Sequence, residues 1–333
     1  MQAWVITSPG PIESEPLRMI EAADPEPGQG ELRIKVKACG ICHTDLHIAE
    51  GEKKPAKLPV TPGHQVVGVV DKIGPKVSGF KVGERVGVSW LYSTCGKCAF
   101  CNSGLENLCE QAKFTGFNYD GGFAEFMIAK AEFTLRLLEN FNDFQTAPLL
   151  CAGIIGWRSL KLSDAKAGET LGLFGFGASA HIVCQVARHL GMEFFAFSRS
   201  REHQELARKL GASWAGSAEE KPPRPVDRAI IFAPIGKVLL DALKHLRRGG
   251  TVAINAVYMD AIPEIDYNRL LFGEKTIRSV SNLTRQDAKE LLELAPKIPI
   301  STEVEIFEFK DLNAALLKLK QGKIIGAAVL KIY

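Results

Sequence analysis

Short apolar runs separated by glycine and proline dominate the first part of the chain. Two of them lie at residues 32–36 and 66–70, inside a stretch that extends from Leu32 to about Phe133. Runs of this length, bounded by turn residues, are typical of β-strands. The pattern predicts a β-rich domain, and residues 3–6 (AWVI) predict a further strand near the start.

The hydrophobic pattern changes after Cys151, where strand-like and helical segments alternate. The pattern predicts strands at residues 170–174, 193–198, 227–232, 251–255 and 276–280, and helices at 178–190, 202–210 and 285–294. Alternation of this kind is typical of a parallel sheet in an α/β domain. The fold class predicted for this half is therefore a doubly wound α/β sheet of the Rossmann type.

The last part of the chain changes pattern again. Alternating residues 303–307 predict a strand, 311–321 a helix and 327–332 an apolar strand, and we expect this tail to return to the first domain. The predicted organisation is a catalytic domain over residues 1–151, a dinucleotide-binding domain over 152–287, and a return to the catalytic domain over 288–333.

Composition narrows the class of partner. The chain has 333 residues, of which 46% are hydrophobic and 24% charged, and its net charge of +3 comes from 41 basic and 38 acidic residues spread along the sequence. No basic block marks a nucleic-acid or membrane surface, so a small-molecule partner is favoured. The longest nearly apolar stretch, residues 147–157, is too short to span a membrane, and we expect a cytoplasmic protein.

Four of the eight cysteines lie close together, within residues 90–112. They follow the spacing C-x2-C-x2-C-x7-C as Cys95, Cys98, Cys101 and Cys109. Such short loops let four thiolates surround one tetrahedral Zn²⁺ ion. Two disulfides are the alternative, but a chain of this length with no signal peptide is expected in a reducing compartment. The spacing therefore predicts a structural zinc that holds a small lobe.

A glycine-rich motif follows the strand predicted at 170–174 and opens the next helix. Residues 175–180 (GFGASA) match the G-x-G-x-x-G/A fingerprint of dinucleotide sites. Gly175 permits the tight turn, Gly177 and Ala178 place backbone next to the pyrophosphate, and Ala180 permits close helix packing. A glycine-rich turn without a ligand is the alternative.

The end of the next strand distinguishes the two nicotinamide cofactors. A ribose 2′-hydroxyl requires a carboxylate there, whereas a 2′-phosphate requires a cation. The chain has Ser198, Arg199 and Ser200 at this position, with no acid at the strand end. Arginine and two hydroxyl donors favour NADP(H). The alternative is that this segment is a solvated turn in which Glu202 stabilises the N-terminus of the next helix. In that case NAD(H) would be accepted as well.

Three further segments carry metal-binding residue types: residues 40–47 (GICHTDLH), 63–65 (GHQ) and 150–154 (LCAGI). With the four-cysteine lobe and the fingerprint, in this order, the chain resembles the zinc-dependent alcohol dehydrogenases, in the microbial branch of the medium-chain dehydrogenase/reductase (MDR) superfamily. The resemblance covers essentially the whole chain. It implies a GroES-like catalytic domain beside the Rossmann domain, an active site in the cleft, and reversible oxidation of alcohols to aldehydes or ketones.

The resemblance also implies residue roles. Cys42, His64 and Cys151 are the implied ligands of a catalytic zinc, giving two Zn²⁺ ions per chain and hydride transfer from a zinc-bound alkoxide. Thr44 is the implied hydroxyl beside the alkoxide and His47 the histidine that passes the proton to solvent.

Other roles implied by the resemblance lie around these ligands. Asp45 would accept a hydrogen bond from His64 and fix its orientation. Trp90 would line the substrate pocket, and His43 would lie at the cofactor pyrophosphate.

Several positions depart from the family pattern. Gln65 replaces a common glutamate behind the zinc, which removes one negative charge near the metal. His43 and Ala327 stand where some members have arginines on the pyrophosphate, so a less charged phosphate clamp is expected. Ala49 and Lys53 stand where related small-alcohol enzymes place bulky aromatics, which implies a wider pocket.

Two rival hypotheses remain. A zinc-free quinone or enone reductase would lack the four-cysteine lobe and the Cys/His/Cys set. The second hypothesis is a catalytically silent nucleotide-binding or structural protein of the same fold. The departures at Gln65 and Ala327 suggest it. The resemblance implies a small alcohol or aldehyde as substrate and a homodimer or homotetramer as assembly, while the individual substrate is not encoded in any motif.

Overall fold

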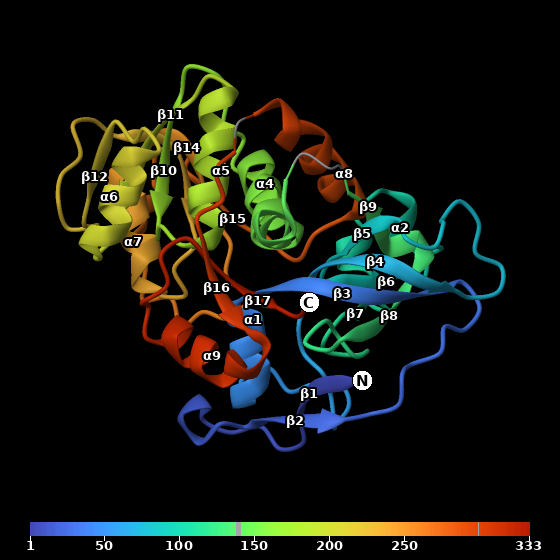
Figure 1. Cartoon of the computed structure of the whole chain (residues 1–333). Coiled ribbons are helices and arrows are strands. Elements are labelled where there is room, and N and C mark those ends of the chain that lie inside the picture. The colour runs from blue at the N-terminus through green and yellow to red at the C-terminus, as the bar shows by residue number, and fades with distance from the viewer. Residues whose placement is uncertain (138–140, 299) are drawn as a thin grey trace. The chain divides into compact units, whose positions relative to one another are not determined.

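The computed structural model describes residues 1–137, 141–298 and 300–333; positions 138–140 and 299, which fall in the predicted catalytic domain, lie outside the described residues. The chain forms two compact units (Figure 1). The first unit comprises Met1–Ala152, Asn282–Glu293 and Thr302–Tyr333. The second comprises Gly153–Ser281 and Leu294–Ser301.

A seven-stranded sheet forms the framework of the first unit. Its strand order is β16-β17-β3-β4-β5-β9, and β8 also pairs with β3. The strands are β3 (Glu31–Ile41), β4 (Gln65–Ile73), β5 (Arg85–Val88), β8 (Phe126–Lys130), β9 (Thr134–Arg136), β16 (Val304–Glu308) and β17 (Ala327–Lys331). Most of β3 alternates between buried and half-buried positions, as a strand with one face in the core requires.

Shorter elements surround this sheet. Two small ladders pair β1 (Gln2–Ile6) with β2 (Leu17–Glu21) and β6 (Leu91–Ser93) with β7 (Lys113–Phe114). The helices are α1 (His43–Glu50), α2 (Ala99–Asn102), α3 (Asp143–Thr146), α8 (Arg285–Leu294) and α9 (Leu312–Lys320). Single turns of 3-10 helix lie at Ile12–Ser14, Glu106–Leu108, Ala131–Phe133, Ala147–Leu150 and Phe309–Asp311; a further one, Ala295–Lys297, belongs to the second unit.

The C-terminal tail contributes two strands to the sheet of the first unit. Strand β17 pairs in parallel with β16 and antiparallel with β3, where Ala328 faces Ile41 and Leu330 faces Cys39. A buried apolar cluster that includes Ala38, Leu150 and Val329 packs across this region. The strand that leads into Cys42 is therefore held between β4 and the tail.

The second unit is a six-stranded parallel sheet with the order β12-β11-β10-β13-β14-β15. Its strands are β10 (Thr170–Phe174), β11 (Glu193–Phe197), β12 (Trp214–Gly216), β13 (Val226–Ile231), β14 (Leu246–Ile254) and β15 (Thr276–Ser279). Its helices are α4 (Ala152–Leu162), α5 (Ala178–His189), α6 (Arg201–Lys209) and α7 (Lys237–His245), with a π-helical turn at Tyr267–Leu271. This order is that of the Rossmann fold, so the predicted fold class is confirmed.

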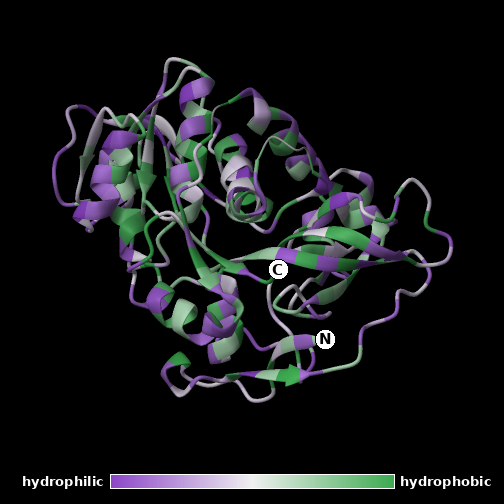
Figure 2. Ribbon diagram, in the orientation of Figure 1, coloured by the Kyte–Doolittle hydropathy of each residue, from purple (hydrophilic) through white to green (hydrophobic). Residues whose placement is uncertain are grey.

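Hydrophobic colours concentrate on the central strands of this sheet, whereas its helices alternate between hydrophobic and hydrophilic positions (Figure 2). Strands β10 and β11 are almost fully buried, and Phe174 stacks on Phe197 with ring centroids 4.1 Å apart. Parallel strands covered on both faces need such continuous apolar runs. Of the helices described, none is both long enough and apolar enough to cross a lipid bilayer.

Candidate functional site

The structure brings together Cys42, His64 and Cys151, the three predicted ligands of a catalytic metal. Their ligand atoms all lie within 4.8 Å of one another, and Cys42 Sγ lies 3.5 Å from His64 Nε2. Cys42 is the N-cap of α1, His64 immediately precedes β4, and Cys151 follows the Ala147–Leu150 turn. Three separate segments of the first unit therefore converge on one point.

The backbone next to His64 has little room. Gly63 has a φ of +95°, and a Cβ placed there would lie 2.8 Å from the backbone nitrogen of Phe123 and 3.0 Å from Cys39 Sγ. Only glycine adopts this conformation without strain in so little space. The turn aims the next side chain, His64, towards Cys42.

Asp45 connects these segments. Its carboxylate accepts hydrogen bonds from Cys42 N at 2.9 Å and Gly63 N at 3.1 Å, and its Oδ1 lies 3.1 Å from His64 Nδ1. Asp45 is 1% exposed. Holding Nδ1 against a carboxylate leaves Nε2 directed at Cys42, which is how proteins commonly orient a metal-binding histidine.

The protonation of the three side chains is coupled. A hydrogen bond from the Cys151 thiol, aided by the nearby His64 imidazolium, holds the pKa of Cys42 well below its usual range despite burial. The same contact raises the pKa of Cys151. Burial favours neutral His64, but Asp45 and Cys42 outweigh it and raise its pKa to about 10.

This donor set fits a catalytic zinc ion. Two sulfurs and one imidazole nitrogen are preferred zinc ligands, and three protein ligands leave a coordination position for a substrate.

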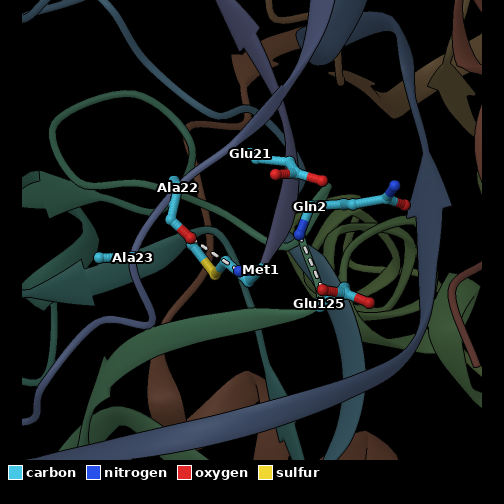
Figure 3. Close-up of a pocket in the computed structure, with 6 residues that line it drawn as sticks. All are labelled: Met1, Gln2, Glu21, Ala22, Ala23 and Glu125. Atoms are coloured by element: carbon cyan, nitrogen blue, oxygen red, sulfur yellow. Dashed lines mark hydrogen bonds between the residues drawn. The ribbon is translucent and has the colours of Figure 1, made fainter.

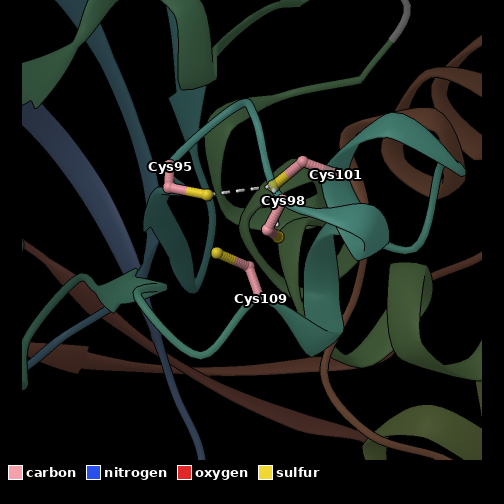
Figure 4. A group of neighbouring side chains, drawn as sticks. All are labelled: Cys95, Cys98, Cys101 and Cys109. Carbon is pink, nitrogen blue, oxygen red and sulfur yellow. Dashed lines mark hydrogen bonds between the residues drawn. The ribbon is translucent and has the colours of Figure 1, made fainter.

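The four cysteines of the lobe also converge (Figure 4). Cys95, Cys98, Cys101 and Cys109 have ligand atoms within 4.8 Å of one another. The Sγ–Sγ distances are 3.6 Å for Cys98 and Cys101 and 3.9 Å for Cys95 and Cys101, far longer than the roughly 2.05 Å of a disulfide. All eight cysteines of the chain are free thiols. The arrangement fits tetrahedral zinc and not two disulfides.

Backbone N–H groups in the lobe stabilise the thiolate form of Cys95. The N–H groups of Lys97 and Cys98 donate towards Cys95 and lower its pKa to about 6. A thiolate is therefore present near neutral pH, and thiolate is the form that binds metal.

An ion pair ties the lobe to the rest of the first unit. Arg285, at the start of α8, places Nη2 2.7 Å from Glu106 Oε2, and its backbone N donates to Glu106 Oε1 at 2.8 Å. Glu106 is 7% exposed, and the pair spans 179 positions of sequence.

The predicted proton-relay residues lie on α1. Thr44 and His47 are both buried and are three positions apart, so they share one face of the helix. His47 Nδ1 lies 2.5 Å from Glu52 Oε2, and the Glu52 side chain is 42% exposed. Glu52 thus connects His47 to solvent, a partner that no motif had indicated.

Trp90 lies against His64, one of the three predicted metal ligands. Its ring meets His64 edge to face at 5.0 Å between centroids and stacks on Phe114 at 4.9 Å. Its Nε1 donates to Asn282 Oδ1 at 3.1 Å. Trp90 is therefore fixed in orientation beside His64.

The glycine motif of the second unit forms the turn between β10 and α5. Gly175 has a φ of +90°, and a Cβ there would lie 3.0 Å from the nitrogen of Ala233. Gly177 is the N-cap of α5; within the described chain no side chain caps this end, and no atom lies within 4 Å of a Cβ built on Gly177. Ala178 begins the helix and Ala180 is fully buried. The space at Gly177 fits a phosphate bound at the helix start.

Ser198, Arg199 and Ser200 lie between β11 and α6. Arg199 is exposed, whereas Ser200 is the N-cap of α6: its Oγ accepts from His203 N at 3.2 Å and donates to Glu202 Oε2 at 2.7 Å. Ser198 Oγ accepts from Ser200 N at 3.3 Å. Ser200 thus uses its hydroxyl both as donor and as acceptor within the turn, whereas Ser198 only accepts there, so Ser198 and the exposed Arg199 are better placed than Ser200 to donate to a phosphate.

The remaining predicted positions are spread over the first unit. His43 begins α1 and is exposed, Gln65 is buried at the start of β4, and Ala327 is 4% exposed at the start of β17.

A separate surface hollow lies beside β1 and β2 (Figure 3). It has a volume of about 460 Å³ and is lined by Met1, Gln2, Glu21, Ala22, Ala23 and Glu125. Gln2 N donates to Glu125 Oε2 at 2.7 Å, and the amino group of Met1 donates to Ala22 O at 2.7 Å. None of the predicted site residues lines it.

Two family models match the chain. The alcohol dehydrogenase GroES-like domain matches residues 28–139, and the zinc-binding dehydrogenase model matches residues 180–297. Together they cover more than half of the sequence.

Individual proteins match over nearly the full length. The chain is 43% identical to a probable alcohol dehydrogenase, AdhA, of Mycobacterium tuberculosis (strain CDC 1551 / Oshkosh), over 100% of this chain and 97% of that one. It is 36% identical to an alcohol dehydrogenase of Geobacillus stearothermophilus, over 96% and 97%. A cobalt- and zinc-bound thermostable alcohol dehydrogenase of Pyrobaculum aerophilum superposes with a TM-score of 0.90 at 25% identity, over 100% and 99%.

Proposed function

The chain belongs to the zinc-binding alcohol dehydrogenase family, within the MDR superfamily, and we propose that it interconverts an alcohol and an aldehyde or ketone using NADP(H). The observation that carries the proposal is the convergence of Cys42, His64 and Cys151 within 4.8 Å, with Asp45 holding His64 Nδ1. Family membership supports the reaction class. The zinc ligands, the mechanism and the preference for NADP(H) over NAD(H) are the parts proposed.

Cys42, His64 and Cys151 would hold the catalytic metal through two sulfurs and His64 Nε2. When bound, zinc supplies a Lewis acid that lowers the pKa of an alcohol hydroxyl and polarises a carbonyl. Asp45 keeps His64 in the orientation that this requires. Trp90, packed on His64, excludes water from one side of the reacting centre.

The side chains of α1 and the residues after it would carry the proton. Thr44 is the hydroxyl nearest to the ligand Cys42 in sequence, and its backbone N donates to Cys42 Sγ at 3.2 Å. The proton would pass from the Thr44 hydroxyl to His47 and from His47 Nδ1 to Glu52, whose side chain reaches solvent.

Glu52→Gln is expected to lower kcat for alcohol oxidation about three- to tenfold, because the amide cannot take a proton from His47. Steady-state rates measured at low and high imidazole buffer provide the check, since a small external base should replace the lost carboxylate. Glu13→Gln is the control: it removes an exposed carboxylate that pairs with Lys320 and not with His47. If Glu52→Gln has the same kcat as the parent enzyme at low imidazole concentration, Glu52 does not take part in proton transfer from His47.

The second unit would bind the cofactor. The pyrophosphate would lie at the start of α5 beside Gly177, where the described chain leaves open space. Arg199, exposed after β11, would pair with the 2′-phosphate of NADP(H).

Arg199→Ala is expected to reduce kcat/KM for NADPH about 10- to 100-fold and to change that for NADH little, because a charge-assisted hydrogen bond contributes ~1.5–3 kcal/mol. Arg201→Ala removes the same charge two residues later and serves as the matched control. An equal loss with both cofactors, or an NADH preference in the parent enzyme, would refute the 2′-phosphate assignment.

The reaction itself is tested with zinc-replete protein and a panel of short and aromatic aldehydes, following absorbance of the reduced nicotinamide. Oxidation of NADPH with any aldehyde supports the proposal. Silence with NADPH and NADH alike would favour the catalytically silent nucleotide-binding protein.

Two further properties are proposed. We propose a cytoplasmic location, because the cysteines assigned to the two zinc sites must stay reduced to bind metal, as they do in a reducing compartment. The apolar side chains of Phe100, Leu105 and Leu108 are each about two-fifths exposed and offer surface for subunit contact, in keeping with a homodimer or homotetramer.

A further inference from the structure

The Lys53 ammonium contacts two neighbouring aromatic rings, one of which packs on the predicted metal ligand His64. Its Nζ is 5.0 Å from the centroid of the Trp90 ring and 5.3 Å from that of Phe117. The two rings are 6.0 Å apart and tilted by 49°. Both distances are within the range of a cation–π interaction.

The backbone holds Lys53 in this place. Its N–H donates to His47 O at 3.0 Å just after α1, and three residues later Ala56 N donates to Phe117 O at 3.3 Å. The loop that carries the lysine is thus attached to α1 on one side and to the Phe117 segment on the other.

The ammonium group is close to the reacting centre. The Trp90 ring that it contacts is itself 5.0 Å from the His64 ring. Lys53 Nζ and His64 can therefore be no farther apart than these two centroid distances combined. One small substrate is therefore long enough to contact Lys53 with one end and the predicted metal site with the other.

Lys53 carries a charge that no carboxylate of the described chain neutralises. Within residues 1–137, 141–298 and 300–333 it forms no ion pair, and the acids next to its loop have other partners: Glu52 pairs with His47 and Asp120 with Lys57. Partial burial lowers the pKa of Lys53, although the negative charge of Cys42 opposes the change. Aromatic faces compensate a half-buried cation only in part, and desolvating it without an anion is costly.

We propose that Lys53 binds an anionic group of the substrate, so that the enzyme acts on alcohols or aldehydes that carry a carboxylate or a phosphate a short distance from the reacting carbon. This inference rests on the proposed function. Trp90 and Phe117 would flank the substrate between its two polar ends, and Lys53 would set its orientation towards the metal site. The resemblance at Lys53 implied only a wider pocket. The half-buried ammonium against Trp90 and Phe117 indicates in addition that the ligand is an anion.

A matched set of aldehydes tests the inference. 4-Formylbenzoate and 4-formylbenzamide are nearly isosteric and differ in charge, and 4-formylphenyl phosphate distinguishes phosphate from carboxylate. We expect kcat/KM for 4-formylbenzoate to exceed that for the amide at least about tenfold, the scale of one charge-assisted hydrogen bond. Lys53→Gln should bring this ratio close to one, and Lys53→Arg should retain most of it.

The ratio of two substrates separates recognition of charge from general damage, because a loss of stability lowers both rates together. Lys54→Gln removes the neighbouring charge from an exposed side chain of the same loop and should leave the ratio unchanged. A phosphate that outperforms the carboxylate, with the same dependence on Lys53, would assign the natural substrate to the phosphate esters.

Two outcomes overturn the inference while leaving the proposed function intact. One is a parent enzyme that reduces the amide as well as the benzoate. The other is a charge preference that survives Lys53→Gln. If no aldehyde is reduced at all, the proposed function fails, and calorimetric titration of zinc-loaded protein with 4-formylbenzoate decides about Lys53: a Kd at least about tenfold weaker in Lys53→Gln supports anion binding, and equal Kd values refute it.

Discussion

Cys151→Ala is expected to abolish measurable turnover and to reduce bound zinc from two ions per chain to one. Cys42 and His64 would remain as the only protein ligands of the ion, and two ligands do not hold zinc in a catalytic site. A Lewis acid supplies several kcal/mol to the reaction, so its loss corresponds to about three orders of magnitude in rate. Metal analysis of purified protein and aldehyde-dependent oxidation of NADPH measure the two effects.

The control for this variant is Cys184→Ala. Cys184 is a fully buried thiol in α5 that belongs to neither cysteine group, so the substitution removes the same atom from an ordinary core position. Two zinc ions and parent-like turnover are expected there. A Cys151→Ala protein that kept two zinc ions and full activity would remove Cys151 from the metal site.

The sequence predicted the second unit well because its strands have a simple physical pattern. Strand β10 was predicted at its observed bounds, and helix α5 to within one residue, since a buried parallel strand, a glycine turn and an amphipathic helix each leave a local signal. The prediction for β14 began at 251, whereas the strand begins at Leu246. Leu246 pairs with Val226 across an irregularity in the register, and such a pairing has no local pattern.

The convergence of Cys42, His64 and Cys151 was expected from their motifs, whereas hydrogen-bond partners from other segments were harder to expect. Asp45 was expected beside His64, but its hydrogen bond with Gly63 N depends on a turn that only the fold shows. Glu52 lies beyond the Gly51 helix cap, so no helical spacing connects it to His47. The contact of Lys53 with Trp90 and Phe117 joins loops far apart in sequence, which periodicity cannot encode.

The residues after β11 have roles that the sequence alone does not distinguish. Ser198 and Ser200 were expected to donate hydrogen bonds to a phosphate, yet Ser200 donates to Glu202 and caps α6, whereas Ser198 only accepts a hydrogen bond from Ser200 N. Serine before a helix serves either purpose, and the sequence does not distinguish them. The prediction of NADP(H) therefore rests on Arg199 and Ser198.

Cys98→Ala is expected to lower the melting temperature by about 10 °C or more and to release the other zinc ion. The lobe has little apolar burial to replace the metal: Phe100, Leu105 and Leu108 are each about two-fifths exposed, and Cys109 is the buried apolar side chain among them. A segment of this kind obtains its folding free energy from bound metal, and a loss of several kcal/mol in a chain of this size shifts the melting temperature by this amount. Thermal unfolding followed by circular dichroism, with zinc analysis, measures both changes.

Ser103→Ala provides the matched control, because it removes a small side chain from the same lobe whose hydroxyl only donates to Phe100 O. It should retain two zinc ions and the parent melting temperature. The two zinc predictions are separable: Cys151→Ala should lose activity with a modest change in stability, whereas Cys98→Ala should lose stability while folded protein in the cold still turns over. Since Cys98 contacts none of Cys42, His64 and Cys151, a Cys98→Ala protein that is fully folded but inactive would contradict the assignment of a purely structural ion to the lobe.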